Sequence, residues 1–214
     1  CWRIVRVGGD GSVKLILHND NTAGVANPCD SANNSAGAAF ARYSGETYKS
    51  KFNTNYNDNA YIGFMYGTAG ASDYATTHAN TNKSTILTNL ETWYNNNLKT
   101  YESVIADTVW CNDKTNVTDT SYNPWSYGGN ATGLGYGTNK TYYGATKRLV
   151  STSGSAGGTG PSLKCNGELN KLNSKVGLIT ADELAFAGYA YGKRNTTTYL
   201  QENATDTYWW SLSP

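Results

Sequence analysis

The chain has 214 residues, of which only 15% are charged, and its net charge at pH 7 is +1. So small a charge does not favour binding to nucleic acid or to anionic membranes, and no apolar run approaches the ~20 residues of a membrane-spanning helix. The chain is instead rich in Asn (25), Gly (23) and Tyr (17). This composition is typical of an extracellular protein with long ordered loops, and its aromatic content argues against disorder. The chain shows neither an initiator Met nor a signal peptide, as we expect of a mature product or an excised domain.

The cysteine pattern predicts two disulfides. The four cysteines form no Cys-x-x-Cys pair, whereas a structural zinc site normally has paired ligands at short spacing. Of the three possible pairings we favour Cys1–Cys29 and Cys111–Cys165, because each closes one contiguous region. The alternative is four free thiols in a reducing compartment. We expect no metal and no cofactor.

The first elements follow from alternation and helical spacing. Residues 1–18 predict a β-hairpin that turns at residues 8–11, and residues 19–41 predict a loop held by Cys29. Residues 60–67 predict a short buried strand. Apolar side chains recur at helical spacing over residues 84–98, and Asn82 or Ser84 can cap this helix. A shorter helix is predicted over 101–107, followed by a strand over 109–111.

The second half of the chain is less regular. Residues 112–164 form a long Gly- and Tyr-rich segment, and a loop of this length inside a compact domain is usually functional or disordered. Thr180 and Glu183 have the spacing of a capping box, which predicts a helix over 181–187 that ends at Gly188. Residues 208–214 predict an aromatic strand.

Six segments recur in the same order in a known group of domains. They are Cys1–Arg6, Tyr61–Gly67, Thr92–Tyr94, Trp110–Asp113, Gly177–Glu183 and Tyr208–Pro214. These segments span nearly the whole chain. On them the chain resembles bacterial and phage surface domains with a C-type-lectin-like fold. That architecture is related to formylglycine-generating enzymes and to retroelement-diversified variable proteins. The resemblance implies one α+β domain, residues 1–214, with a twisted antiparallel sheet, two main helices and long ordered loops that present a ligand face.

The chain departs from this family in two respects. Relatives usually continue past the Trp-Ser-Leu-Ser-Pro motif into further strands; without them, an open sheet edge could accept a partner strand or a second copy of the chain. The Glu-Pro-Asn motif with which true C-type lectins bind calcium does not occur. The resemblance therefore supports the fold more than any sugar chemistry.

No constellation of catalytic residues is apparent. The chain lacks the motifs of hydrolases, zinc proteases and nucleotide-binding proteins. His18 and His78 are far apart in sequence, and we expect both to be ordinary surface residues. Asp182 and Glu183 are explained by their position at a helix N-terminus. We therefore expect no enzyme.

The aromatic residues of the long segment and the C-terminus are the candidate ligand-binding residues, because flat amphipathic rings bind sugars or partner side chains at a low entropy cost. They are Tyr122, Trp125, Tyr127, Tyr136, Tyr142, Tyr143 and Trp210. An alternative is that Trp125 and some of the tyrosines hold the loop on the core. We assign Trp2, Trp93 and Trp110 to the core.

These observations predict an extracellular or cell-surface recognition and adhesion module, or a component of a phage virion, that binds a glycan or protein ligand without catalysis. A second hypothesis is the structural head of a pilin-like or other filament subunit that self-assembles through an open sheet edge. A third is an oxidase-like enzyme of the related fold, which would need a metal. We expect no nucleic-acid partner and no membrane insertion of this segment.

Overall fold

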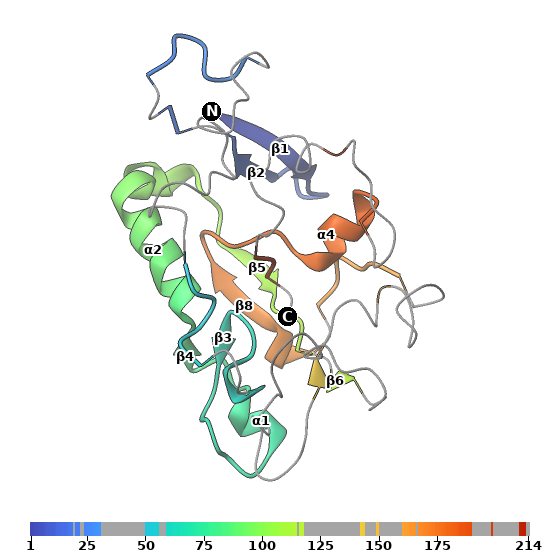
Figure 1. The fold of residues 1–214 in the computed structure, drawn as a ribbon. Coiled ribbons are helices and arrows are strands. Elements are labelled where there is room, and N and C mark those ends of the chain that lie inside the picture. The colour runs from blue at the N-terminus through green and yellow to red at the C-terminus, as the bar shows by residue number, and fades with distance from the viewer. Residues whose placement is uncertain are drawn as a thin grey trace. The chain divides into compact units, whose positions relative to one another are not determined.

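The structure is a computed structural model. It describes residues 1–18, 20–21, 24–30, 50–55, 59–114, 116–117, 142–143, 149, 160–165, 167–189, 198 and 210–212. The chain divides into two compact units. Unit 1 comprises Cys1–Ser50 and Asn195–Trp209, and unit 2 comprises Lys51–Arg194 and Trp210–Pro214. Figure 1 shows the elements of both.

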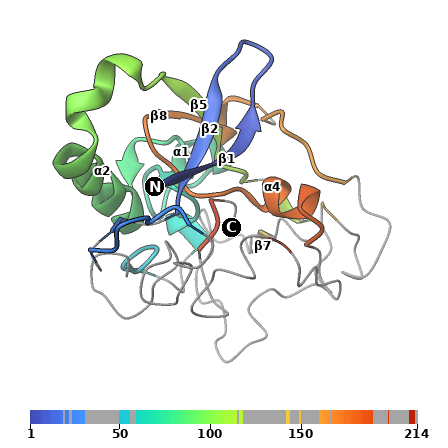
Figure 2. The ribbon, with the colours of Figure 1, turned by 90° about the horizontal axis from the view of Figure 1, so that it is seen from above.

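Unit 1 contains the predicted hairpin, which the structure confirms. β1 (Trp2–Val7) pairs antiparallel with β2 (Val13–Leu17), and the register shifts between Ile4 and Arg6. The two strands are seen as a paired ribbon in Figure 2. In the turn, the Gly8 N–H donates to the Ser12 carbonyl at 2.7 Å, and Gly11 has φ +82°. Glycine adopts this left-handed conformation without a steric penalty.

Unit 2 mixes helices with short strand pairs, an α+β arrangement. Its elements are η3 (Asn59–Tyr61), β3 (Met65–Tyr66), α1 (Tyr74–Thr77), β4 (Asn82–Lys83), α2 (Thr85–Asn97), η4 (Lys99–Val104), β5 (Thr108–Cys111), β6 (Asn116–Val117), β7 (Tyr142–Tyr143), η5 (Glu168–Asn170), β8 (Lys171–Ser174) and α4 (Ala181–Phe186). Among the described residues, β3 pairs with β4, β5 with β8 and β6 with β7, each antiparallel.

The core of unit 2 lies between α2 and the β5–β8 pair. Its buried members are Phe64, Ile86, Leu87, Leu172 and Leu212. The helix predicted over 84–98 is confirmed as α2. Its N-cap is Ser84, whose hydroxyl accepts a hydrogen bond from the Leu87 N–H at 3.3 Å. Such a cap stabilises a helix by about 1 kcal/mol.

The predicted capping box is also confirmed. The Thr180 hydroxyl accepts from the Glu183 N–H at 3.1 Å, and the Glu183 carboxylate accepts from the Thr180 N–H at 3.0 Å. Asp182 is buried and accepts a hydrogen bond from the Ser162 N–H at 2.7 Å. Helix α4 ends before Gly188, which has φ +94°.

Three predicted elements differ from the observed ones. The strand predicted over 60–67 is reduced to Met65–Tyr66, because the η3 turn and Gly63, with φ +84°, break the extended backbone before it. The helix predicted over 101–107 is the 3₁₀ helix η4. Within 208–214, the described residues 210–212 form no strand, and the remainder lies outside the described residues.

The predicted core tryptophans have separate outcomes. Trp110 is half-buried against the core, and its ring N–H donates to the Ser174 carbonyl at 2.7 Å. Trp93 is half-buried on α2. The assignment of Trp2 to the core is wrong, because its side chain is 39% exposed on the hairpin.

Both predicted disulfides are present. Cys1 is bonded to Cys29 within unit 1, and Cys111 to Cys165 within unit 2. The second bond ties the end of β5 to the segment that leads into η5 and β8. None of the helices in the described part of the chain is long and apolar enough to cross a membrane.

Candidate functional site

Trp210 is the one predicted ligand-binding residue whose side chain the structure describes. It is 54% exposed. The Phe52 ring packs edge-on against it, with the two ring centroids 5.7 Å apart. Edge-to-face packing of this kind stabilises an aromatic pair by about 1 kcal/mol. Phe52 in turn packs against the core of unit 2, so it supports an aromatic ring that faces solvent.

Of the other six candidates, the structure describes only the backbone of two. Tyr142 and Tyr143 form β7, where they pair with Val117 and Asn116. The remaining four lie outside the described residues, and they are Tyr122, Trp125, Tyr127 and Tyr136. Their predicted role in ligand binding stays a prediction.

The hairpin of unit 1 carries an apolar face, of which only Trp2 was assigned to the core from the sequence. Register puts three cross-strand pairs on this face: Trp2 with Leu17, Ile4 with Leu15 and Val7 with Val13. Five of the six side chains are exposed, and Ile4 is 67% exposed. The opposite face carries the cations Arg3, Arg6 and Lys14. Clustered exposed apolar side chains mark interaction surfaces.

Unit 2 also contains a buried polar cluster, formed by His78, Asn80, Asn112 and Lys114. His78 is the C-cap residue of α1, and Asn80 follows it with φ +57°. Asn112 and Lys114 follow β5, directly after Cys111. His78, Asn112 and Lys114 are fully buried, and Asn80 is half-buried.

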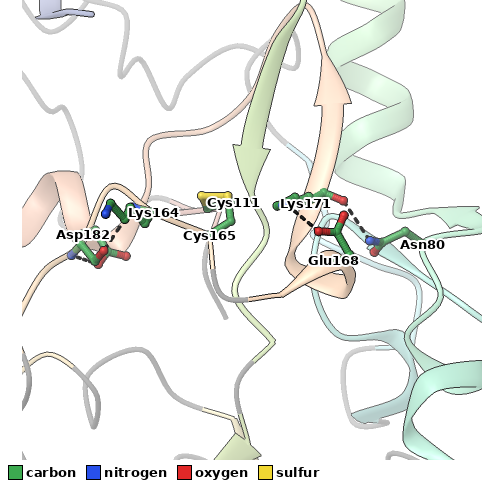
Figure 3. The surroundings of a disulfide bond; sticks show 8 residues. Asn80, Cys111, Lys164, Cys165, Glu168, Lys171 and Asp182 are labelled. Carbon is green, nitrogen blue, oxygen red and sulfur yellow. Dashed lines mark hydrogen bonds and ion pairs between the residues drawn. A yellow bond between two sulfur atoms is a disulfide. The ribbon is translucent and has the colours of Figure 1, made fainter. Parts of the chain in front are cut away.

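Lys114 and Asn80 are the centre of this cluster. The Lys114 ammonium donates to the His78 carbonyl at 3.1 Å and to Asn80 Oδ1 at 2.5 Å. Asn80 Nδ2 donates to the carbonyls of Leu169 and Lys171 at 2.9 and 3.1 Å. Figure 3 shows Asn80 pointing toward Lys171, to one side of the disulfide.

Asn112 connects the cluster to the strand β3. Its Oδ1 accepts from the Phe64 N–H at 2.7 Å, and its Nδ2 donates to the Met65 carbonyl at 3.3 Å. A Cβ at Gly63 would lie 2.6 Å from Asn112 Oδ1, so only glycine fits there. The Asn112 amide thus takes the place of a backbone partner beside β3.

Burial shifts the titration of both bases in the cluster. Desolvation lowers the pKa of Lys114 to about 7, because the charged amine loses its hydration inside the protein. Desolvation, and then the nearby charge of Lys114, lower the pKa of His78 to about 3. His78 is therefore neutral at pH 7, and Lys114 is present in both its charged and its neutral form.

The prediction that both histidines are surface residues is wrong. His18 and His78 are fully buried. His78 sits beneath the Tyr74 ring, with the ring centroids 4.6 Å apart. The sequence around residue 78 is short, polar and aperiodic, so it shows no signal of burial. Lys114 was missed for the same reason, since a lysine in a polar segment is normally solvated.

The described residues show no metal-binding arrangement: no group of three or more His, Cys, Asp and Glu side chains is placed to hold an ion. Both members of the acidic pair accept backbone hydrogen bonds: Asp182 from the Ser162 N–H, and Glu183 from the Thr180 N–H in the capping box of α4.

Comparison with known proteins finds no match among protein-family models, curated proteins or solved structures. The functional argument therefore depends on the residues of this chain.

Proposed function

We propose that the protein is a non-catalytic extracellular recognition module, in which exposed aromatic side chains contact a glycan or protein ligand. The proposal includes the C-type-lectin-like fold that the order of the sequence motifs favours. The observation that carries it is the exposed indole of Trp210, which packs against the Phe52 ring. Two disulfides are consistent with an oxidising environment outside the cell.

The physical basis is the cost of exposing a tryptophan. A large aromatic side chain gains ~2 kcal/mol when it is fully buried, so an exposed one has free energy to gain from contact with a partner. The indole has few rotatable bonds, and Phe52 restricts it further. Little entropy is therefore lost on binding, which favours recognition by Trp210.

The experiment compares Trp210→Ala with the wild type on glycan and protein arrays. We expect the substitution to weaken binding at least about tenfold, as a central aromatic contact does, with a change in melting temperature of only a few degrees. Tyr101→Ala is the matched control, because Tyr101 is an aromatic residue of unit 2 that is 60% exposed on η4. Equal binding by the Trp210→Ala variant and the wild type would contradict the proposal.

A second candidate function is the head of a self-assembling filament subunit. The specific observation that favours it is the exposed apolar face of the hairpin, which pairs Ile4 with Leu15 and Val7 with Val13. Sedimentation velocity over a range of protein concentrations tests it. Concentration-dependent association supports assembly, and a monomer at every concentration removes this candidate.

A further inference from the structure

The buried amine of Lys114 lies against the side-chain amide of Asn80. Nζ is 2.5 Å from Oδ1, less than the usual N–H···O separation of about 2.9 Å. A carbonyl bond is about 1.23 Å long, so Nζ is at most about 3.7 Å from the carbonyl carbon Cγ. Atoms about 3–3.5 Å apart are placed to react. The amine therefore stands next to an electrophilic carbon.

We propose that Lys114 and Asn80 react within the folded protein to form an isopeptide bond. The neutral amine attacks Cγ, and a bond forms between Nζ and Cγ. The bond between Cγ and Nδ2 then breaks, and Nδ2 leaves as ammonia with the proton that the amine gives up. The products are one secondary amide and one ammonia molecule, so the reaction needs no oxidant and no cofactor.

Burial makes the Lys114 amine a nucleophile, because it favours the uncharged form. Lys114 is fully buried, and desolvation lowers its pKa to about 7. In a large fraction of the molecules the Lys114 amine is then uncharged at neutral pH, whereas a solvated lysine is almost entirely protonated. A desolvated lysine amine is an activated nucleophile.

Hydrogen bonds hold the amide in place for attack. Asn80 Nδ2 donates to the carbonyls of Leu169 and Lys171, which fixes the plane of the carboxamide. Asn112 Nδ2 lies 3.5 Å from Asn80 Oδ1 and donates toward it. This donor is placed beside the oxygen on which negative charge develops when Nζ attacks.

The backbone around the pair leaves room for the lysine stem. A Cβ at Gly63 would approach Lys114 Cε to 3.0 Å, so the absence of a side chain there lets the stem pass. The Tyr74 hydroxyl donates to the Lys114 carbonyl and fixes the backbone of the lysine. The fold thus places both reacting groups before any bond forms.

The cross-link would join the segment after α1 to the segment after β5. It would lie three residues beyond Cys111, whose disulfide is at the same end of β5. Unlike the disulfide, an amide is not broken by reducing agents. Under reducing conditions the isopeptide alone would still join the segment after β5 to the segment after α1.

Mass spectrometry of the reduced, denatured full chain tests the proposal. We expect the wild type to be lighter than its sequence mass by about 17 Da, the mass of ammonia. Lys114→Arg and Asn80→Ala should restore the full mass. Lys83→Arg is the matched control, because Lys83 is exposed and paired with Glu91 at 2.6 Å; this variant should keep the loss.

Tryptic mapping locates the modification. An isopeptide at Lys114 blocks cleavage after that residue, so we expect a branched peptide that joins residues 52–83 to residues 100–140. A wild-type chain with its full sequence mass would overturn the proposal, even if the two variants fail to fold. A loss of ammonia that maps to another asparagine would overturn it as well.

Discussion

At the scale of single residues, Gly63 shows how a backbone conformation determines which side chains can pack beside it. Its φ of +84° is strained for any residue with a Cβ, and the added Cβ would meet Asn112 Oδ1 at 2.6 Å. Gly70 has a similar φ of +78° but nothing within 4 Å. The two glycines therefore separate the cost of the backbone from the cost of the clash.

We predict that Gly63→Ala lowers the free energy of unfolding by at least about 1 kcal/mol more than Gly70→Ala does, because only the first disturbs the buried cluster. Urea denaturation of the two variants measures the difference. Equal losses would show that the Asn112 amide does not constrain this position.

The titration of Lys114 gives a second residue-scale prediction. In the Asn80→Ala variant the Lys114 amine is not converted into an amide, and we expect desolvation to keep its folded pKa well below its unfolded value of 10.5. Between pH 7 and 9 the unfolded chain then holds a proton that the folded chain has lost. The free energy of unfolding therefore rises with pH, by up to about 1.4 kcal/mol per pH unit, and this contribution is lost as the pH falls through 7.

A cross-linked wild-type chain has no titrating amine at Lys114. Its free energy of unfolding should therefore lack this rise with pH. Chemical denaturation of both proteins at pH 7, 8 and 9 makes the comparison. The same rise in both proteins would mean that the wild-type amine still titrates.

At the scale of elements, the hairpin combines an apolar face with a basic one. If the apolar face is a contact between copies, Ile4→Lys should weaken association at least about tenfold, because it places a charge in the middle of that face. Val104→Lys is the control, since Val104 is 82% exposed on η4 in unit 2. Sedimentation velocity reports both, and equal association of the two variants would exclude this face from assembly.

Local patterns allowed several elements to be predicted, because their cause is local. The hairpin follows from alternation and a glycine turn, α2 from helical spacing and its Ser84 cap, and α4 from its capping box. The strand predicted over 60–67 is mostly absent because Gly63 turns the backbone, which an apolar run does not reveal. The two disulfides are predicted because each of these pairings closes one contiguous region of the chain.

The candidate sites were less predictable, since their contacts span long separations. Asn80 meets Lys114 across 34 positions and Lys171 across 91. No window of sequence contains such a cluster, and a polar segment does not show that His78 is buried. Trp2 is likewise exposed on the hairpin although its side chain is large and apolar, because burial depends on tertiary packing that the sequence around it does not show.

At the scale of the whole molecule, each unit has its own disulfide. In unit 2 the bond joins cysteines 54 positions apart, and closing a loop of this size stabilises a fold by about 4 kcal/mol in the chain-entropy model. A covalently closed unit can expose aromatic side chains such as Trp210 without losing its shape. This stability suits the extracellular recognition module that we propose.

Calorimetric titration of the ligand that the arrays identify, into the wild type and into Trp210→Ala, tests recognition by the exposed indole most directly. The account predicts that the variant binds at least about tenfold more weakly, a loss of about 1.4 kcal/mol in binding free energy. The same affinity for both proteins would contradict it.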